Sequence, residues 1–384
     1  MNGRGSNGSP AALYHRFRPG SPSLRSEPVT AIASPVATPR LLSRTLRVVG
    51  LAIVAVSGYC IVLWLLLYLI VGLPLDTGFP VALQQTVNAL SIGAIYALIA
   101  LGYTMVYGII ELINFAHGDI FMLGAFLSVV FLGGIMGQTG AVEQVLPLTL
   151  LLLGALAFTM PIIGLLNVAI ERSVYRPLRN APRLAPLITA IGVSFILQNV
   201  ALILAGSGDR SAPQIFPLSW QIHIGQASIS VLSIFIFTLA MVLMTALQLF
   251  ITRTRMGRAM RATAQDREAS ALMGVDMNQT ISLTFLLGGA LAAAAGVVWG
   301  LRFGYVRFDL GFNAGLKAFT AAVLGGIGNI TGAVLGGFVI GFIENGASAL
   351  GYSRWSEFLV FLILTFVLIF KPTGILGQAS GDRA

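Results

Sequence analysis

The sequence INFAHGD, residues 113–119, interrupts a chain that is otherwise strongly apolar. The 34 residues 77–110 before it carry no charge, and the 23 residues 120–142 after it carry none either. Each run exceeds the roughly 20 residues that an α-helix needs to cross about 30 Å of hydrocarbon. The polar residues between the runs therefore predict a break between two membrane helices, where non-helical backbone must be covered by protein or face a water-filled cavity.

The composition of the whole chain agrees with a protein embedded in lipid. Hydrophobic residues make up 56% of its 384 residues and charged residues only 10%, whereas soluble domains carry about 25% charged residues. The 44 glycines suit close helix–helix contact in a membrane. A single cysteine, Cys60, excludes a disulfide framework and a cysteine-based metal site within the chain.

The other uncharged runs predict the remaining membrane segments. The first, 48–75, follows residues 1–47, which hold seven Arg against one Glu and which we expect to form a disordered basic tail. The run 211–252 is too long for one helix, and its prolines predict a loop before a helix that begins near Ser228. The other runs cover 144–170, 184–208, 277–301, 318–343 and 358–370.

The segment 310–350 is too long for one ordinary helix and is interrupted at GGIGNITG. We expect a short membrane segment near 313–326, a break at Gly325–Asn329 and a helix to about Leu350. The pattern leaves open whether the short segment spans the membrane or re-enters from one side. Glycines recur every fourth residue here and predict close helix packing: Gly328, Gly332 and Gly336.

Arginine determines the orientation of the chain. The loops 172–183 and 253–276 hold four and five arginines, and the positive-inside rule puts both loops and the basic tail in the cytoplasm. The sequence therefore predicts an all-α polytopic membrane protein of about ten membrane segments. One of these segments is short or re-entrant, and both termini are cytoplasmic.

Polar residues at the two breaks are the candidates for a translocation path. Ionisable groups within membrane segments are functional candidates by default, and paired interruptions in the two halves of a chain point to a transporter's central pathway. In the alternative interpretation Asn114 and Asp119 cap helix ends and His117 is a packing residue. The residues alone leave both interpretations open for the candidate set Glu111, Asn114, His117, Asp119 and Asn329.

Neither a metal centre nor a nucleotide site is expected in the chain. Its three histidines, His15, His117 and His223, are far apart and form no HExxH helix. A GxxxxGK[ST] phosphate loop does not occur, so the chain cannot bind ATP by that route. We expect no cofactor, no catalytic residue and no enzymatic activity of its own.

The cytoplasmic loop near 252–280 has amphipathic helical character, and Gly274 follows Glu268 by six residues. This pattern resembles the EAA–x3–G signature of ABC-importer permeases, in which the loop forms a short helix that docks on the ATPase subunit. A solvated loop that only sets topology is the alternative. The resemblance implies a coupling role for Arg258, Arg261, Glu268, Ala269 and Gly274.

Three longer stretches resemble the membrane subunits of branched-chain amino-acid ABC importers. They are ALIALGYTMVYGIIELINFAHGDIFMLGAF (97–126), KAFTAAVLGGIGNITGAVLGG (317–337) and FKPTGILG (370–377). The resemblance covers roughly 82–377 in order. It implies the ABC-importer permease fold for that region, preceded by an extra transmembrane helix at 48–75 and by the tail.

The same resemblance implies a function and partners. The function is ATP-driven import of branched-chain or other apolar amino acids across a bacterial inner (plasma) membrane. The partners are ABC ATPase subunits that hydrolyse the ATP, a second permease that is identical or related, and an external solute-binding protein, without nucleic acid. Urea, short amides or polar amino acids are alternative substrates within the family. A stand-alone secondary transporter is the rival class, although most spans lack the buried acids that ion coupling often uses.

Overall fold

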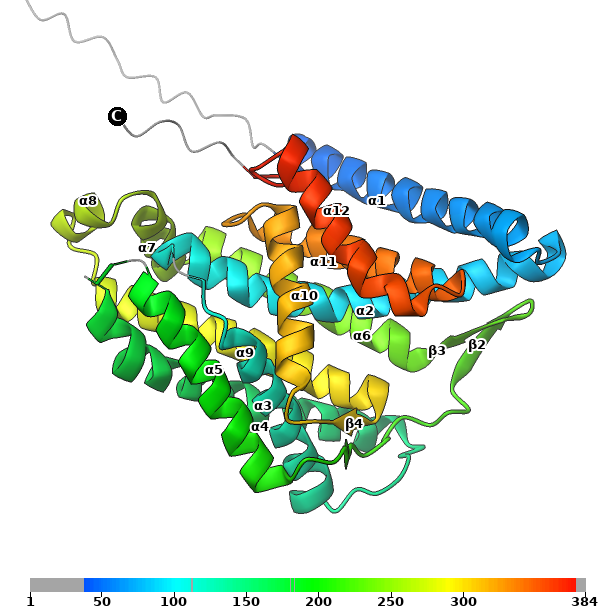
Figure 1. Ribbon diagram of the computed structural model, residues 1–384, viewed down its shortest axis with the longest axis horizontal. Coiled ribbons are helices and arrows are strands. Elements are labelled where there is room, and N and C mark those ends of the chain that lie inside the picture. Colours follow the sequence, from blue (N-terminus) through cyan, green and yellow to red (C-terminus); the bar gives the residue numbers. More distant parts are fainter. Residues whose placement is uncertain (1–37, 112, 180, 183, 378–384) are drawn as a thin grey trace, which may run out of the picture. The chain divides into compact units, whose positions relative to one another are not determined.

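The computed structural model describes residues 38–111, 113–179, 181–182 and 184–377 (Figure 1). The chain divides after Ala52 into two compact units, and the second contains the later part of α1 and every element after it. Residues 1–37 of the expected tail lie outside the described residues. Residues 38–47 differ from the expectation, because they form the first turns of α1. Leu and Arg favour helices, and this stretch holds three of each, so the helix begins before the apolar run.

Helices dominate the fold, as the apolar runs predicted. Among the described residues nine helices are long and apolar enough to cross a membrane, and α10, with 16 residues, is the short additional segment. The chain is therefore an all-α polytopic membrane protein. Its membrane helices are α1 (Thr38–Leu66, continued by Leu67–Val71), α2 (Leu75–Ile110), α3 (His117–Val129, continued by Val130–Ile135), α4 (Val145–Ile170, continued to Leu178), α5 (Leu184–Ala205), α6 (Val231–Arg253), α9 (Met277–Phe303), α10 (Leu310–Gly325), α11 (Ile330–Ala349) and α12 (Ser356–Phe370).

Short elements form the connections between these helices. The loop expected before Ser228 contains a β-hairpin, and α6 begins slightly later, at Val231. Its start is fixed by Ser230, whose hydroxyl accepts a hydrogen bond from the N–H of Leu232. The short elements are the helices α7 (Arg255–Gln265) and α8 (Arg267–Leu272), and the antiparallel strand pairs β1 (Arg210–Ser211) with β4 (Tyr305–Val306) and β2 (Gln221–Ile224) with β3 (Ala227–Ser230).

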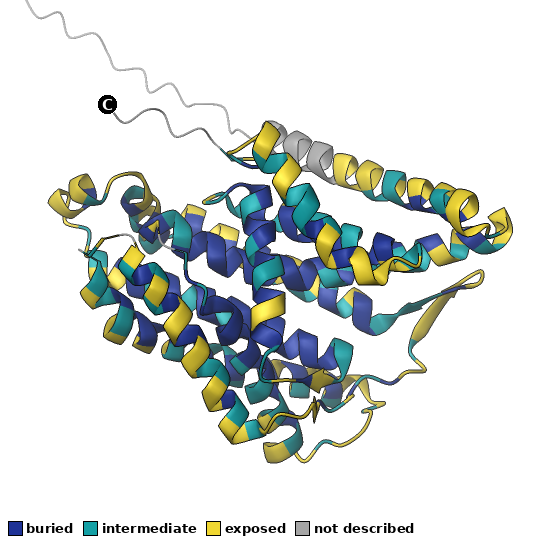
Figure 2. Cartoon of the chain, viewed as in Figure 1, coloured by how far each residue is buried: buried dark blue, intermediate teal, exposed yellow. Residues whose placement is uncertain are grey.

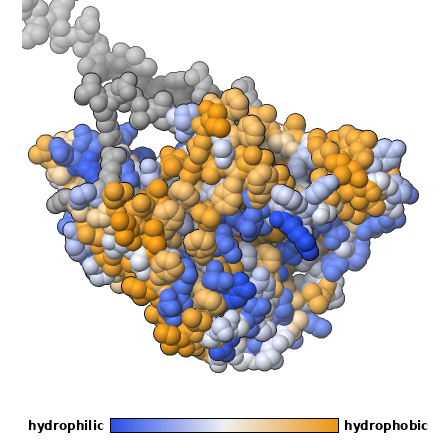
Figure 3. Space-filling model, in the orientation of Figure 1, coloured by the Kyte–Doolittle hydropathy of each residue, from blue (hydrophilic) through white to orange (hydrophobic). Residues whose placement is uncertain are grey.

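The centre of the second unit is formed by α2 and α9 (Figure 2). In their most apolar stretches 89% and 78% of the residues are buried, against 22% in α5 and 11% in α12. Apolar side chains cover α5 and α12 on the face shown in Figure 3, whereas hydrophilic side chains gather over α7 and α8. The apolar outer faces of α5 and α12 agree with contact to lipid. The hydrophilic side chains of α7 and α8 indicate that these two helices lie outside the apolar layer.

Glycines permit the close approach of α11 to its neighbours. A methyl group at Gly341 would lie 2.6 Å from the carbonyl oxygen of Ala89 in α2. Gly332 and Gly336 pack tightly against Gly325 and Ala321 of α10, which agrees with the packing role expected for them. Gly328 does not share the α11 face with them, because it lies before α11 in a turn with φ +85°. That left-handed backbone is the reason why glycine stands there.

The two arginine-rich loops lie at the same end of the helices, as the positive-inside rule requires. Arg179 in the first loop donates a hydrogen bond of 2.7 Å to Asn278, which begins α9 directly after the second loop. The break between α10 and α11 lies at this end too, since Gly328 packs near Gly108 in the last turns of α2. We call this the inner end, and the end that carries the strands the outer end.

α3 begins inside the apolar layer and not at its inner surface. His117 lies against Gly102 of α2 and Gly288 of α9. These glycines are eight residues before the end of α2 and eleven after the start of α9. At 1.5 Å per residue, His117 is therefore roughly 12–17 Å from the inner end. The break at INFAHGD folds into the helix bundle.

Candidate functional site

The break between α2 and α3 is organised by Asn114. Its side chain is buried, and Oδ1 accepts hydrogen bonds from the N–H of Ala116 at 3.1 Å and from the hydroxyl of Tyr175 at 2.7 Å. Glu111 ends α2 with φ +56°, the one positive value at a non-glycine residue in the described part of the chain, and its side chain is exposed. Such backbone conformations cost of order 1–3 kcal/mol and cluster at functional sites. Through its hydrogen bond with Tyr175, Asn114 therefore links the turn after Glu111 to the end of α4.

His117 and Asp119 lie in the first turn of α3, and at most 1% of either residue is exposed. Asp119 Oδ2 accepts a hydrogen bond of 2.5 Å from Ser194 of α5. The imidazole of His117 meets the Tyr103 ring edge-on, with 4.7 Å between the ring centroids. Neither of its nitrogens has a hydrogen-bond partner among the described residues. Both side chains are enclosed by protein, and their part in a translocation path stays a prediction.

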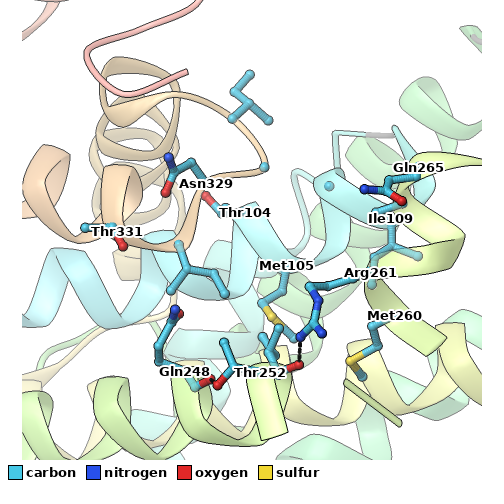
Figure 4. A pocket seen from close by; sticks show the side chains of 16 residues that line it. Thr104, Met105, Ile109, Gln248, Thr252, Met260, Arg261, Gln265, Asn329 and Thr331 are labelled. Atoms are coloured by element: carbon cyan, nitrogen blue, oxygen red, sulfur yellow. Dashed lines mark hydrogen bonds between the residues drawn. The ribbon is translucent and has the colours of Figure 1, made fainter. Parts of the chain in front are cut away.

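A cavity of about 470 Å³ opens at the inner end (Figure 4). We call it the inner cavity, and its walls come from α2, α6, α7 and the turn after α10. Figure 4 shows Gln248 and Thr252 of α6 on one side and Asn329 and Thr331 on the other. Asn329 is thus a path candidate in the wall of the inner cavity. Its Oδ1 also caps α11 by accepting from the N–H of Gly332 at 3.1 Å.

The predicted coupling loop forms two helices, α7 and α8, where the sequence suggested one. Asp266 separates α7 from α8 and caps α8 by accepting a hydrogen bond from the N–H of Ala269 at 3.0 Å. Gly274 follows α8 with φ +82°, the left-handed conformation expected of a C-terminal cap. Of the other predicted coupling residues, Arg258, Glu268 and Ala269 are exposed, and Arg261 lines the inner cavity and bonds to the carbonyl oxygen of Ile251.

The end of α8 that points away from the membrane helices is apolar. Leu272 and Met273 are 89% and 85% exposed there. At the opposite end of α8, Arg267 donates hydrogen bonds to the carbonyl oxygen of Ile109 from Nε at 3.2 Å and from Nη2 at 2.8 Å. The last carbonyls of a helix have no partner within it, and Arg267 satisfies one of them in α2. Sequence analysis missed this residue, because nothing in the local pattern connects 267 with 109.

A buried ion cluster stabilises the first arginine-rich loop, 172–183, at the inner end. The Glu171 side chain is wholly buried and lies 3.3 Å from Arg176 and 2.5 Å from Arg179. Ser282 of α9 donates a third contact to it at 2.7 Å. Two of the arginines that set the topology therefore also hold the loop to α9.

A second cavity, of about 410 Å³, lies at the outer end, and we call it the outer cavity. In it Lys317 Nζ of α10 lies 2.8 Å from Glu344 Oε1 of α11 and 3.5 Å from Glu357 Oε1. Tyr96 of α2 donates a hydrogen bond of 2.8 Å to Glu344 Oε2. Sequence analysis missed this set, although Lys317 and Glu344 directly flank the uncharged run 318–343.

Arg307 and Asp309 lie beside the outer cavity, in the connection between β4 and α10. Arg307 Nη2 donates to Asp309 Oδ2 at 2.7 Å. This hydrogen bond and the nearby negative charge raise the pKa of Arg307. Arg307 and Asp309 therefore form an ion pair with each other at the edge of the cavity.

Comparison with known proteins identifies the family. A family model described as branched-chain amino acid transport system / permease component matches residues 85–368. The permease protein BraD of the high-affinity branched-chain amino acid transport system of Pseudomonas aeruginosa is 44% identical over 309 residues, which are 78% of this chain and 97% of BraD. The corresponding protein LivH of Escherichia coli is 42% identical over 307 residues, again 78% and 97% of the two chains.

More distant relatives extend the likeness beyond bacteria. A probable branched-chain amino acid transport permease protein LivH of Methanocaldococcus jannaschii is 26% identical over 293 residues, which are 73% of this chain and 88% of that protein. No solved structure matches this chain.

Proposed function

The chain belongs to the branched-chain amino acid transport permease family, and from this premise we propose that it is one of two permeases in an ATP-driven importer of branched-chain amino acids. It is a multi-pass membrane protein and a transport component. The family match reaches from α2 into α12 and leaves α1 outside it. The added helix and the tail are therefore not needed to account for the family's function.

We propose that the importer contains three further kinds of subunit. A separate ATPase hydrolyses ATP, because the chain has no GxxxxGK[ST] phosphate loop. A second permease, identical or related, completes the membrane part, and an external solute-binding protein delivers the amino acid. The relatives are named as permease proteins of transport systems, which supports an assembly of several subunits.

The contact between Arg267 and Ile109 is the observation that carries the coupling mechanism. Leu272 and Met273 give the tip of α8 an exposed apolar surface outside the lipid layer, which suits a groove on an ATPase subunit. The other end of α8 is bonded to the last turn of α2, directly before the break and in the wall of the inner cavity. A displacement of α8 by the ATPase would therefore move the end of α2 and the break together.

We assign the outer and inner cavities to the two ends of the translocation path. α2 lines both, with Tyr96 in the outer cavity and Thr104 in the inner one. Eight residues separate these positions, which is about 12 Å along a helix. Tyr103, the neighbour of Thr104 in α2, packs against Phe319 of α10 with 5.9 Å between the ring centroids. We propose that a substrate passes from one cavity to the other when α2 and α10 move apart at these two rings.

A defined co-expression experiment tests the assembly. The tagged chain is produced together with the ATPase, the second permease and the binding protein of its own transport system, and is purified in mild detergent. We expect the ATPase to co-purify in a fixed ratio, and cells that carry the set to take up leucine, isoleucine and valine. A chain that supports uptake in cells without the ATPase would contradict the proposal and favour a secondary transporter. Uptake of urea or short amides in place of these amino acids would contradict the substrate assignment alone.

A further inference from the structure

The outer cavity combines a charged cluster with an apolar wall. The side chains of Lys317 and Glu344 are 13% and 20% exposed, so both charges are largely removed from water. The second carboxylate near Lys317, that of Glu357, is 61% exposed and lies 3.5 Å from it. The lining also contains aromatic and aliphatic residues, which we call the apolar wall and which include Ile92, Trp299, Phe303, Tyr305 and Leu310.

The charges in the outer cavity do not balance. Arg307 and Asp309 neutralise each other, which leaves one ammonium group, that of Lys317, facing the carboxylates of Glu344 and Glu357. Asp209 adds a further carboxylate to the wall. The cluster therefore carries an excess of negative charge and can accept a positive group, and Lys317 is its one ammonium group to which a negative group can bind in exchange for Glu344.

Uncommitted polar groups accompany this cluster. Asn313 lines the cavity and presents its amide. The amide of Asn345 is already bonded, because its Nδ2 donates a hydrogen bond of 2.9 Å to the carbonyl oxygen of Gly341. Trp299 also lines it, is only 8% exposed, and its indole Nε1 has no hydrogen-bond partner among the described residues. A buried donor without a partner costs about 1–3 kcal/mol, and a polar ligand or a water molecule in the cavity would remove that cost.

We propose that the outer cavity is a binding site for the zwitterionic head of an amino acid, with Lys317 receiving the α-carboxylate and Glu344, assisted by Glu357, receiving the α-ammonium group. This assignment rests on the proposed function and adds to it the residues that recognise the substrate. The apolar wall then faces the aliphatic side chain. Its volume of about 410 Å³ falls in the usual range for small-molecule sites, about 300–1,000 Å³.

An ion pair can line a binding site for amino acids because a zwitterionic ligand can replace both of its partners. Breaking a buried pair by removing one partner is strongly unfavourable, because it leaves an uncompensated charge. A zwitterion offers both replacements at once, since its carboxylate takes the place of Glu344 at Lys317 and its ammonium group takes the place of Lys317 at Glu344. A molecule with only one of the two charges leaves one protein group unpaired. The site therefore selects amino acids over the corresponding amines and carboxylic acids.

Binding to the purified importer tests this site directly. The complete complex is placed in lipid nanodiscs without the external binding protein, and binding of radiolabelled leucine is measured. We expect Lys317→Gln and Glu344→Gln each to weaken leucine binding at least tenfold. Arg354→Gln and Glu143→Gln are matched controls, because both residues are exposed near the outer end and away from the cavity lining, and they should bind leucine like the wild type. Unlabelled 4-methylpentanoate and 3-methylbutylamine, which each lack one charge, should compete at least tenfold less well than leucine.

A charge exchange separates recognition from a structural role. The double variant Lys317→Glu with Glu344→Lys keeps an ion pair between α10 and α11 but reverses the positions that the two ends of leucine require. If the ion pair has only a structural role, this variant should bind leucine like the wild type, and that result would overturn the proposed site. If the two residues recognise the substrate, the variant complex should insert and assemble normally but bind leucine at least tenfold more weakly than the wild type.

The two levels of the proposal can fail separately. Wild-type leucine import together with unchanged binding in both single variants contradicts the site and leaves the proposed function standing. A wild-type complex that neither binds nor imports any amino acid contradicts both.

Discussion

Arg267, the first residue of α8, holds the carbonyl oxygen of Ile109 in the last turn of α2 with two hydrogen bonds, of 3.2 and 2.8 Å. The two residues are 158 positions apart in the chain. Their contact joins the cytoplasmic segment that we assign to the ATPase with the helix that lines both cavities. In the proposed importer, this contact would transmit a movement of α8 on the ATPase to the end of α2.

Removal of this contact should uncouple the importer. Arg267→Ala leaves the Ile109 carbonyl without its charged partner, and hydrogen bonds to charged groups contribute about 1.5–3 kcal/mol. We expect leucine uptake to fall at least fivefold while ATPase co-purification stays near the wild-type level. Arg172→Ala, at an exposed arginine on the same inner face, is the control. Equal leucine uptake by the two variants would show that the contact between Arg267 and Ile109 does not couple α8 to α2.

Gly274 provides a separate test of the docking surface. No atom outside its immediate neighbours lies within 4 Å of a Cβ added at Gly274, but its φ of +82° costs a non-glycine residue about 1–2 kcal/mol. We expect Gly274→Asp, and to a lesser degree Glu268→Ala, to lower ATPase co-purification and substrate-stimulated hydrolysis without loss of membrane insertion. Gly274→Ala imposes the backbone cost without a charge or a bulky group and should have a smaller effect. Wild-type ATPase association of Gly274→Asp would make the loop a topogenic linker only.

The break at INFAHGD should matter to transport more than to protein level. Asn114→Ala removes the acceptor for the buried Tyr175 hydroxyl and for the N–H of Ala116, and each unpaired buried group costs about 1–3 kcal/mol. His117→Ala removes the ring that packs on Tyr103. We expect uptake per inserted molecule to fall severalfold in both variants. A parallel fall of uptake and protein level would show that both residues serve folding alone.

Close packing of α11 on α2 should be sensitive to a single methyl group. At Gly341 that group meets the backbone of Ala89 and Gly93 at 2.6 Å, and overpacking typically costs about 1–3 kcal/mol. We expect Gly341→Ala to lower the melting temperature of the purified protein in detergent. Gly192→Ala, in α5 where nothing lies within 4 Å of the added group, should leave that temperature unchanged or slightly higher. Identical melting temperatures for the two variants would contradict the packing described for α2 and α11.

The N-terminal tail should be dispensable for transport. Its sequence is polar and rich in proline and serine, and such a segment can bury little apolar surface. The family match also begins only at residue 85. We expect deletion of residues 2–37 to leave leucine uptake within about twofold of the wild type. A larger loss of uptake by a normally inserted protein would assign the tail a function.

Uncharged runs were sufficient to find the membrane helices, because a span is a local property of about 20 consecutive residues. The turn at 326–329 was also predictable, since glycine permits the left-handed backbone that Gly326 and Gly328 adopt. The depth of His117 was not predictable. It depends on where α3 packs against Gly102 and Gly288, which are distant in sequence.

The pairing of residues in the outer cavity was also not predictable from the sequence. Lys317 and Glu344 flank the run 318–343, and the break in that run folds α10 back on α11, so that the two charges meet. The sequence contained both the charges and the break, but their pairing follows only from the angle between the two helices. Arg267 was missed for a similar reason. By contrast, the left-handed backbone at Gly274 follows from a local signal, a glycine directly after a short helix.

The most direct test of the account is leucine accumulation in proteoliposomes that contain this chain, its second permease and its ATPase, with the external binding protein added outside. The account predicts accumulation against a leucine gradient that requires ATP on the ATPase side and is abolished by an ATPase variant that binds but does not hydrolyse ATP. Arg267→Ala should reduce the leucine transported per ATP hydrolysed. Accumulation that proceeds without ATP, or that is driven by a proton or sodium gradient, would contradict it.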